Sequence, residues 1–116
     1  MILQDILDAI AAIEQFTISI EFEAFSQNLE KVFAVSRAIE IIGEAVKRIP
    51  DSVRSQYSDI PWRDIAVMRD KLIHDNFNTD VEIIWRAVQK DVPQLKMMIC
   101  RVLEDVRGQL WWQWIL

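Results

Sequence analysis

A double apolar pattern between residues 32 and 49 constrains the fold of this chain more than any other sequence feature. One set of residues recurs at alternating intervals of three and four, the period of a helix face: Val32, Val35, Ile39, Ile42, Val46 and Ile49. A second, mostly small set has the same period on a neighbouring face: Ala34, Ala38, Ile41 and Ala45. A helix with two apolar faces is either the central helix of a bundle or part of a subunit interface. Pro50 is expected to end it, because a residue before proline is pushed out of helical geometry.

Other segments on both sides of this helix also have helical periodicity. An apolar stripe predicts a first helix over residues 2–15. Residues 16–27 are expected to form a linker or a short helix, and residues 51–59 a short connection. Pro61 suits the first turn of a helix, because an N–H in that turn would have no helical partner anyway. A further helix is therefore predicted over residues 61–75.

The last predicted helix has the clearest start signal. Thr79 and Glu82 have the spacing of a capping box, in which each side chain satisfies a backbone N–H of the first turn. The apolar stripe behind it continues to about Arg107. Pro93 falls inside this stripe and predicts a kink, because proline removes one backbone hydrogen bond and crowds the preceding turn. Gly108 is expected to terminate the helix.

Length and composition agree with a helical protein. A chain of 116 residues that is 52% hydrophobic is long enough for one domain with a single core. Two glycines and three prolines leave little material for the turns of an all-β fold. We predict an all-α bundle of four to five helices over residues 1–107. Residues 108–116 are predicted to be an apolar, Trp-rich tail that packs against its own bundle or a partner.

Several classes of protein are excluded or disfavoured. The single Cys100 rules out an intramolecular disulfide and a cysteine-clustered zinc site. One histidine leaves only carboxylates as further ligands, so neither a metal nor a cofactor is expected. The N-terminus carries acidic residues where a signal peptide would be basic, and no apolar run approaches the length of a membrane span. We expect a cytoplasmic protein without membrane contact.

The distribution of charge is more informative than its sum. The net charge of −5 argues against a protein that coats nucleic acid, because such proteins neutralise phosphates with Lys and Arg. Residues 1–30 hold six acidic residues and no basic one, whereas residues 31–71 hold eight basic and six acidic residues. The positive stretch leads into residues 68–80, MRDKLIHDNFNTD. It is interpreted either as a solvated helix surface or as a surface that faces phosphate.

Arg69 and His74 are the candidate catalytic residues. Arg69 occupies a position on the apolar stripe of its predicted helix, where a charge must be paired or must face a polar cleft. The single histidine, His74, follows five residues later and lies about 140° further round an ideal helix. The two side chains therefore converge only if the helix loosens after Ile73 or if two copies pair about a two-fold axis.

The chemistry of this pair suits the cleavage of RNA without a metal. That reaction needs a base to activate the 2′-hydroxyl, an acid to protonate the leaving 5′-oxygen, and a cation to stabilise the charged phosphorane. Histidine titrates near neutrality, and arginine makes bidentate contacts with phosphate. A symmetric dimer would bring two histidines to one cleft. By itself, however, an Arg-x4-His spacing is a weak pattern that also fits surface cations or a helix end.

Other polar residues near this pair have two interpretations. A polar stripe on the helix over residues 32–49 either lines a cleft opposite Arg69 or forms a solvated face with a Glu44–Arg48 pair. On this stripe the candidate cleft-lining residues are Arg37, Glu40 and Glu44, and Lys47 lies beside them. Lys71 and Asp75, close to Arg69 and His74, are the other candidate cleft-lining residues. Asp75 either assists His74 or ends the helix. Trp62 and Trp85 are interpreted as core packing rather than as platforms for base stacking.

Four segments together resemble the HEPN superfamily, and in particular the HepT-like ribonuclease toxins encoded beside minimal nucleotidyltransferase (MNT) antitoxins: LQDILDAIAAIE, AIEIIGEAVKRIP, IPWRDIAVMRDKLIHD and DVEIIWRAVQKDVPQLK. The resemblance implies a bundle that forms a homodimer. It also implies that Arg69 and His74 are the catalytic pair of a metal-independent endoribonuclease at the dimer cleft. Asp70 is implied to orient these groups. An MNT antitoxin is the implied partner, and RNA, either mRNA or tRNA, is the implied substrate of this type VII-like toxin-antitoxin pair.

The chain departs from the family pattern at one position. In the family the antitoxin transfers AMP to a tyrosine two residues after the histidine, and this chain has Asn76 there. Its only tyrosine, Tyr57, lies well upstream. The antitoxin is therefore expected to inhibit by binding alone, or the protein is no longer a regulated toxin. The alternative function is a non-catalytic helical subunit that binds the nucleotidyltransferase and positions its substrate.

Overall fold

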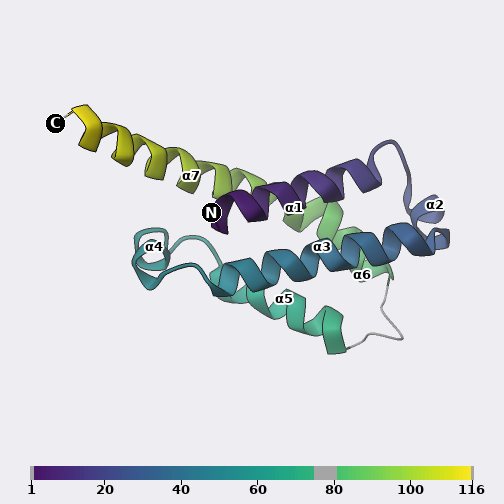
Figure 1. Cartoon of the computed structure of the whole chain (residues 1–116). Helices are drawn as coiled ribbons and strands as arrows, with labels where there is room; N and C mark the ends of the chain where they lie inside the picture. The colour runs from purple at the N-terminus through teal and green to yellow at the C-terminus, as the bar shows by residue number, and fades with distance from the viewer. Residues whose placement is uncertain (1, 75–80, 116) are drawn as a thin grey trace.

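The computed structural model describes residues 2–74 and 81–115, with the backbone alone for residues 69, 71–74 and 109–115. The described residues contain helices and no strand, which confirms the all-α prediction. Figure 1 shows their arrangement. In chain order the elements are α1 (Ile2–Thr17), α2 (Phe22–Gln27), α3 (Leu29–Lys47), α4 (Asp51–Gln56), α5 (Trp62–His74), α6 (Val81–Arg86), the π-helical segment η1 (Ala87–Asp91) and α7 (Val92–Ile115).

Helix α3 is the central helix of the bundle. It packs against α1 on one side and α5 on the other (Figure 1). Val35 and Ile39 of the first apolar face are fully buried, and so is Ala45 of the second face, where Ala38 is 5% exposed. Small side chains allow the neighbouring helix to approach closely, and a second packed face gives α3 two partners. Of the two sequence interpretations, the central helix is thus confirmed within a single chain.

The ends of α3 are satisfied by side chains. The Asn28 side chain accepts a hydrogen bond from the backbone N–H of Lys31 at 3.1 Å, which caps the N-terminus. At the other end the helix stops at Lys47, three residues before Pro50. The Arg54 guanidinium donates to the carbonyl oxygens of Ile49 at 3.0 Å and Val46 at 2.6 Å. They add to the bond that the backbone N–H of Ile49 donates to the carbonyl of Val46 at 3.2 Å.

Two segments with weak sequence signals are short helices. Of the linker or helix expected over residues 16–27, the structure shows α2, whose Phe25 is fully buried in the core. The short connection expected over residues 51–59 contains α4. Pro50 is the residue before α4, so one proline both follows the end of α3 and begins the next turn of helix. Six-residue helices contain too few turns to produce a periodic apolar pattern.

Pro93 distorts the last helical region by widening a turn. The π-helical segment η1 ends two residues before this proline, and the backbone N–H of Val92 donates to the carbonyl of Ala87, five residues back. A proline has no N–H to offer and crowds the preceding turn, and a π turn accommodates both effects. Val88, Val92 and Leu95 stay buried through this region. The kink expected from the sequence is therefore a π bulge.

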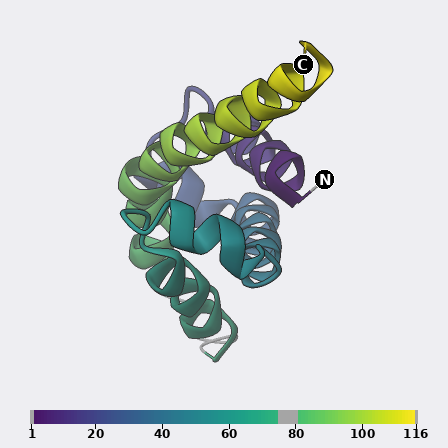
Figure 2. The same ribbon diagram turned by 90° about the vertical axis from the view of Figure 1, so that its left-hand side faces the viewer.

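The prediction that Gly108 ends the last helix is wrong. Helix α7 continues through Gly108 to Ile115. Glycine ends helices by adopting a positive φ, and no described glycine has one. Within a helix it costs only about 1 kcal/mol relative to alanine. A Cβ at Gly108 would meet nothing within 4 Å, and Figures 1 and 2 show α7 extending beyond the other helices.

The division into a bundle over residues 1–107 and a tail over residues 108–116 remains a prediction, and so does the packing of that tail. None of the described helices is both long enough and apolar enough to cross a membrane.

Candidate active site

Helix α5 carries the candidate catalytic residues, and its first residue is firmly held. Trp62 is only 6% exposed, and its indole Nε1 donates to the backbone carbonyl of Tyr57 at 3.1 Å. From there α5 runs against α3. Trp85 is half-buried, with its ring 5.1 Å from that of Phe25 and 6.2 Å from that of Phe22. Both tryptophans therefore pack as predicted.

The connection that leads into α5 is tied to α7. The Tyr57 hydroxyl donates to Oδ2 of Asp105 at 2.7 Å, and the Arg101 guanidinium lies 5.5 Å from the Tyr57 ring centre. Arg101 also donates to both carboxylate oxygens of Asp59, at 3.0 and 2.8 Å. This bond lowers the pKa of Asp59. The hydrogen bond to Asp105 raises the pKa of Tyr57, and burial adds to the rise.

Replacing Tyr57 with phenylalanine should therefore change both stability and its dependence on pH. Loss of a hydrogen bond to a charged acceptor should reduce the free energy of unfolding by about 1–2 kcal/mol at pH 8. The pKa of Tyr57 is higher in the folded than in the unfolded protein, so its contribution is present below about pH 10 and is lost as the pH rises further. Urea unfolding should show a smaller difference in the free energy of unfolding between the wild type and Tyr57→Phe at pH 11 than at pH 8. An equal difference at both pH values would contradict the assignment.

Arg69 and His74 both lie in α5, and the helix remains regular through His74. Position 69 follows Trp62 by seven residues, about two turns of the helix. His74 is the last described residue of α5. The loosening expected after Ile73 would fall mainly at residues 75–80, which lie outside the described residues. Convergence of the two residues across a two-fold dimer remains as the other hypothesis.

Asp70 is held by a residue of another helix. Its Oδ1 lies 3.2 Å from Nζ of Lys47 at the end of α3, and both side chains are partly exposed. The residues of the polar stripe on α3 therefore have different partners. Lys47 reaches α5, whereas Arg37 pairs with Glu40 at 3.3 Å along its own helix. Glu44 is half-buried, and its predicted pair with Arg48 stays a prediction.

The remaining candidates fall at the edge of the described structure. Lys71 belongs to α5, and its backbone alone is described. Asp75 and Asn76 lie outside the described residues, and so does Thr79 of the predicted capping box. Tyr57, the only tyrosine of the chain, is 7% exposed and its hydroxyl is bonded to Asp105. It is therefore a poor substitute for the tyrosine that Asn76 replaces.

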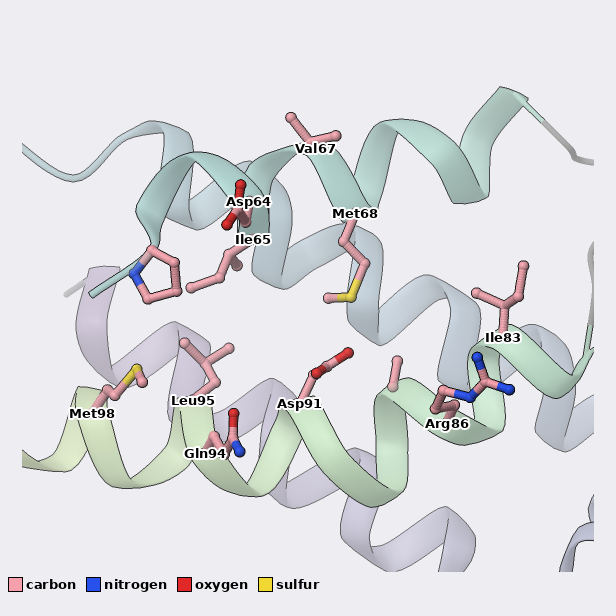
Figure 3. Close-up of a pocket in the computed structure, with 12 residues that line it drawn as sticks. Asp64, Ile65, Val67, Met68, Ile83, Arg86, Asp91, Gln94, Leu95 and Met98 are labelled. Atoms are coloured by element: carbon pink, nitrogen blue, oxygen red, sulfur yellow. The ribbon is translucent and has the colours of Figure 1, made fainter. Parts of the chain in front are cut away.

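A groove of about 490 Å³ separates α5 from the α6–α7 side of the bundle, and no sequence pattern predicted it (Figure 3). Met68 and Ile65 of α5 face Leu95 of α7 across it. Its other lining residues include the charged Asp64, Arg86 and Asp91. Val67 and Ile83, also in the lining, are 42% and 51% exposed. Exposed apolar residues beside a groove are typical of a contact surface.

Comparison with known proteins shows the family of the chain. The family described as "Ribonuclease HepT-like" matches residues 6–102. The chain belongs to the HepT-like family. This HepT-like chain is similar to "Probable ribonuclease HepT" of Thermococcus cleftensis, with 51% identity over 94 residues that cover 81% of the chain and 86% of the relative. A Methanocaldococcus jannaschii protein with an RNase name is 39% identical over 107 residues, 92% of the chain and 88% of the relative.

Neither a solved structure nor a metal-binding group adds to this assignment. No solved structure matches the HepT-like chain. Among the described side chains, no group of three or more His, Cys, Asp or Glu residues is placed to hold a metal ion.

Proposed function

We propose that this HepT-like protein is a metal-independent endoribonuclease, the toxin of a toxin-antitoxin pair, which cleaves single-stranded RNA such as mRNA or tRNA. The observation that carries the proposal is the match of residues 6–102 to a ribonuclease family, with both motif residues on one helix. Arg69 and His74 are the proposed catalytic residues, and Asp70 orients them.

The proposed reaction is an internal transfer at phosphorus. An imidazole takes the proton of the 2′-hydroxyl, and the 2′-oxygen attacks the adjacent phosphorus while the bond to the 5′-oxygen breaks. A second imidazole, already protonated, gives its proton to the leaving 5′-oxygen. Arg69 stabilises the additional negative charge on the phosphorane with paired N–H donors. The products are a 2′,3′-cyclic phosphate and a 5′-hydroxyl.

The proposed mechanism requires a homodimer, because each chain has one histidine and the reaction uses a base and an acid. The groove beside α5 supports this requirement. Val67 and Met68, which line it, lie on the helix that carries Arg69 and His74. A copy that covered these apolar side chains would bury them and bring a second α5 close to the first. Interfaces of stable dimers have apolar centres of this kind.

The proposal is tested with the purified full chain and a 5′-labelled single-stranded RNA in EDTA. We expect cleavage that leaves a 2′,3′-cyclic phosphate, because the reaction uses side chains alone. The matched control is the same oligonucleotide made of DNA, which lacks the attacking 2′-hydroxyl and should remain intact. Cleavage that appears only after a divalent cation is added, or equal cleavage of the DNA, would refute the mechanism.

The proposed partner is an MNT-type nucleotidyltransferase. Since Asn76 replaces the family tyrosine and Tyr57 is buried, we propose that this partner inhibits by binding rather than by transferring AMP. The alternative function is a non-catalytic helical subunit of that nucleotidyltransferase, and the acidic net charge favours it. Expression without the nucleotidyltransferase separates the two functions, because only a toxin would stop growth.

A further inference from the structure

A second hollow adjoins the groove at Arg86, between α2 and the α6–η1 region. Its volume is about 410 Å³, and small-ligand sites usually have volumes of about 300–1,000 Å³. The lining residues are Phe22, Glu82, Trp85, Arg86 and Gln89. Arg86 also lines the groove beside α5, at the end marked by Ile83 in Figure 3. The two hollows therefore meet at one guanidinium.

Two aromatic rings form the apolar wall of this hollow. Trp85 is half-buried and packs on the fully buried Phe25, with ring centres 5.1 Å apart. Phe22 is also half-buried, and its ring centre lies 6.2 Å from that of Trp85. A ring that the core already holds can stack on a flat ligand with its remaining surface at little further cost in side-chain entropy. Packing on Phe25 and stacking on a ligand are therefore compatible for Trp85.

The polar groups of the hollow suit a nucleotide. Arg86 is exposed, and among the described residues its guanidinium has no hydrogen bond or ion pair. It is the one described cation that lines either hollow. An available guanidinium makes paired contacts with a phosphate. The amide of Gln89, which is also exposed, can donate to and accept from the edge of a base.

We propose that this hollow is a subsite for one nucleotide of the single-stranded RNA, with the base stacked on Trp85 and a phosphate bound by Arg86. Stacking needs no particular base, because every base has a flat face. The carboxylates of Glu82, Glu21 and Glu23, in the hollow or beside Phe22, disfavour further phosphates, so the subsite takes a single nucleotide. The strand then continues past Arg86 toward α5. This assignment of the ligand rests on the proposed function.

The test measures binding separately from cleavage. The probe is a fluorescein-labelled 2′-O-methyl oligouridine, which lacks the attacking hydroxyl and stays intact, and the measurement is fluorescence anisotropy with the full chain. Trp85→Leu should weaken binding by about 5- to 100-fold, the effect of losing one stacking ring at comparable sites. Trp85→Phe keeps an aromatic face and should retain most of the affinity.

Arg86 is tested through the salt dependence of the same binding. Each phosphate contact with a single strand contributes about 0.7 to the slope of log K against log salt concentration. Arg86→Met should therefore weaken binding and reduce the magnitude of that slope by about 0.7, whereas Trp85→Leu should leave the slope unchanged. The matched control is Lys90→Met, which removes the same charge from an exposed position that lines neither hollow. That variant should keep the affinity and the slope of the wild type.

Three results would overturn the subsite: a wild-type chain that does not bind the probe, a folded Trp85→Leu with unchanged affinity, or a Lys90→Met with the same loss of slope as Arg86→Met. Circular dichroism shows whether Trp85→Leu remains folded. If it does not, Arg86→Met and Lys90→Met decide the question, because both positions are exposed. A chain that binds the probe as expected but leaves ordinary RNA uncut would refute the proposed function and retain the subsite.

Discussion

Replacement of His74 with alanine is expected to reduce RNA cleavage by about 10²–10⁴-fold, the contribution that a general acid or base makes in comparable enzymes. Arg69→Ala should cause a loss of similar size, because no other group would stabilise the phosphorane charge. The buried residues of the described core lie at other positions, so both variants should stay folded. The measurements are single-turnover cleavage of a labelled RNA, circular dichroism and the mass in solution.

The matched control for Arg69→Ala is Arg63→Ala, which removes the same charge from an exposed position in the first turn of the same helix. That variant should retain cleavage within a few-fold of the wild type. Variants at 69 and 74 that cleave as fast as Arg63→Ala would show that the site is wrong. Inactive variants that are also monomeric would be uninformative about chemistry, so a dimer of unchanged mass is required for the comparison.

Trp62→Ala is expected to have the largest effect on stability of any change near the site. The side chain is 6% exposed, and its indole donates to the carbonyl of Tyr57. Truncation of a buried tryptophan to alanine leaves a cavity and costs about 3–5 kcal/mol. The loss should also release the start of α5, because Trp62 joins this helix to the connection that Tyr57 and Asp59 tie to α7. Urea unfolding followed by circular dichroism measures the change.

Trp62→Phe separates the two contributions of the side chain. Phenylalanine keeps most of the apolar packing and loses the Nε1 donor, so it should cost about 1–2 kcal/mol, less than the alanine variant. Trp85→Ala is a useful comparison, because Trp85 is half-buried and should lose less than Trp62→Ala. A loss below about 1 kcal/mol for Trp62→Ala would contradict its role as the anchor of α5.

Long helices were predictable from the sequence because their contacts repeat. The apolar residues of α1 and α3 recur every three or four positions, and burial of that stripe is what stabilises such helices. Helix α4 has six residues and no buried side chain, so no period was available to predict it. The prediction that Gly108 ends a helix was wrong because the sequence does not distinguish a glycine at a helix end from a glycine inside a helix.

The sequence likewise predicted some parts of the candidate site and missed others. Arg69 and His74 were identifiable because their types and spacing, with the resemblance of the surrounding segments, indicate a chemistry. The groove beside Met68 and the bond from Lys47 to Asp70 join residues that are far apart in the chain, so no sequence spacing predicts them. The sequence places Lys47 on a polar stripe of α3 but does not show which helix that stripe faces.

By itself, the sequence determined the helical class, the two apolar faces of α3 and the residues whose chemistry suits catalysis, because periodic burial and side-chain chemistry are local properties. Only the tertiary structure decided which cation reaches Asp70, how Tyr57 ties the start of α5 to α7, and where the surface is hollowed. Those features depend on how helices cross in space, and crossing geometry is set by packing between distant segments rather than by the order of residues along any one of them.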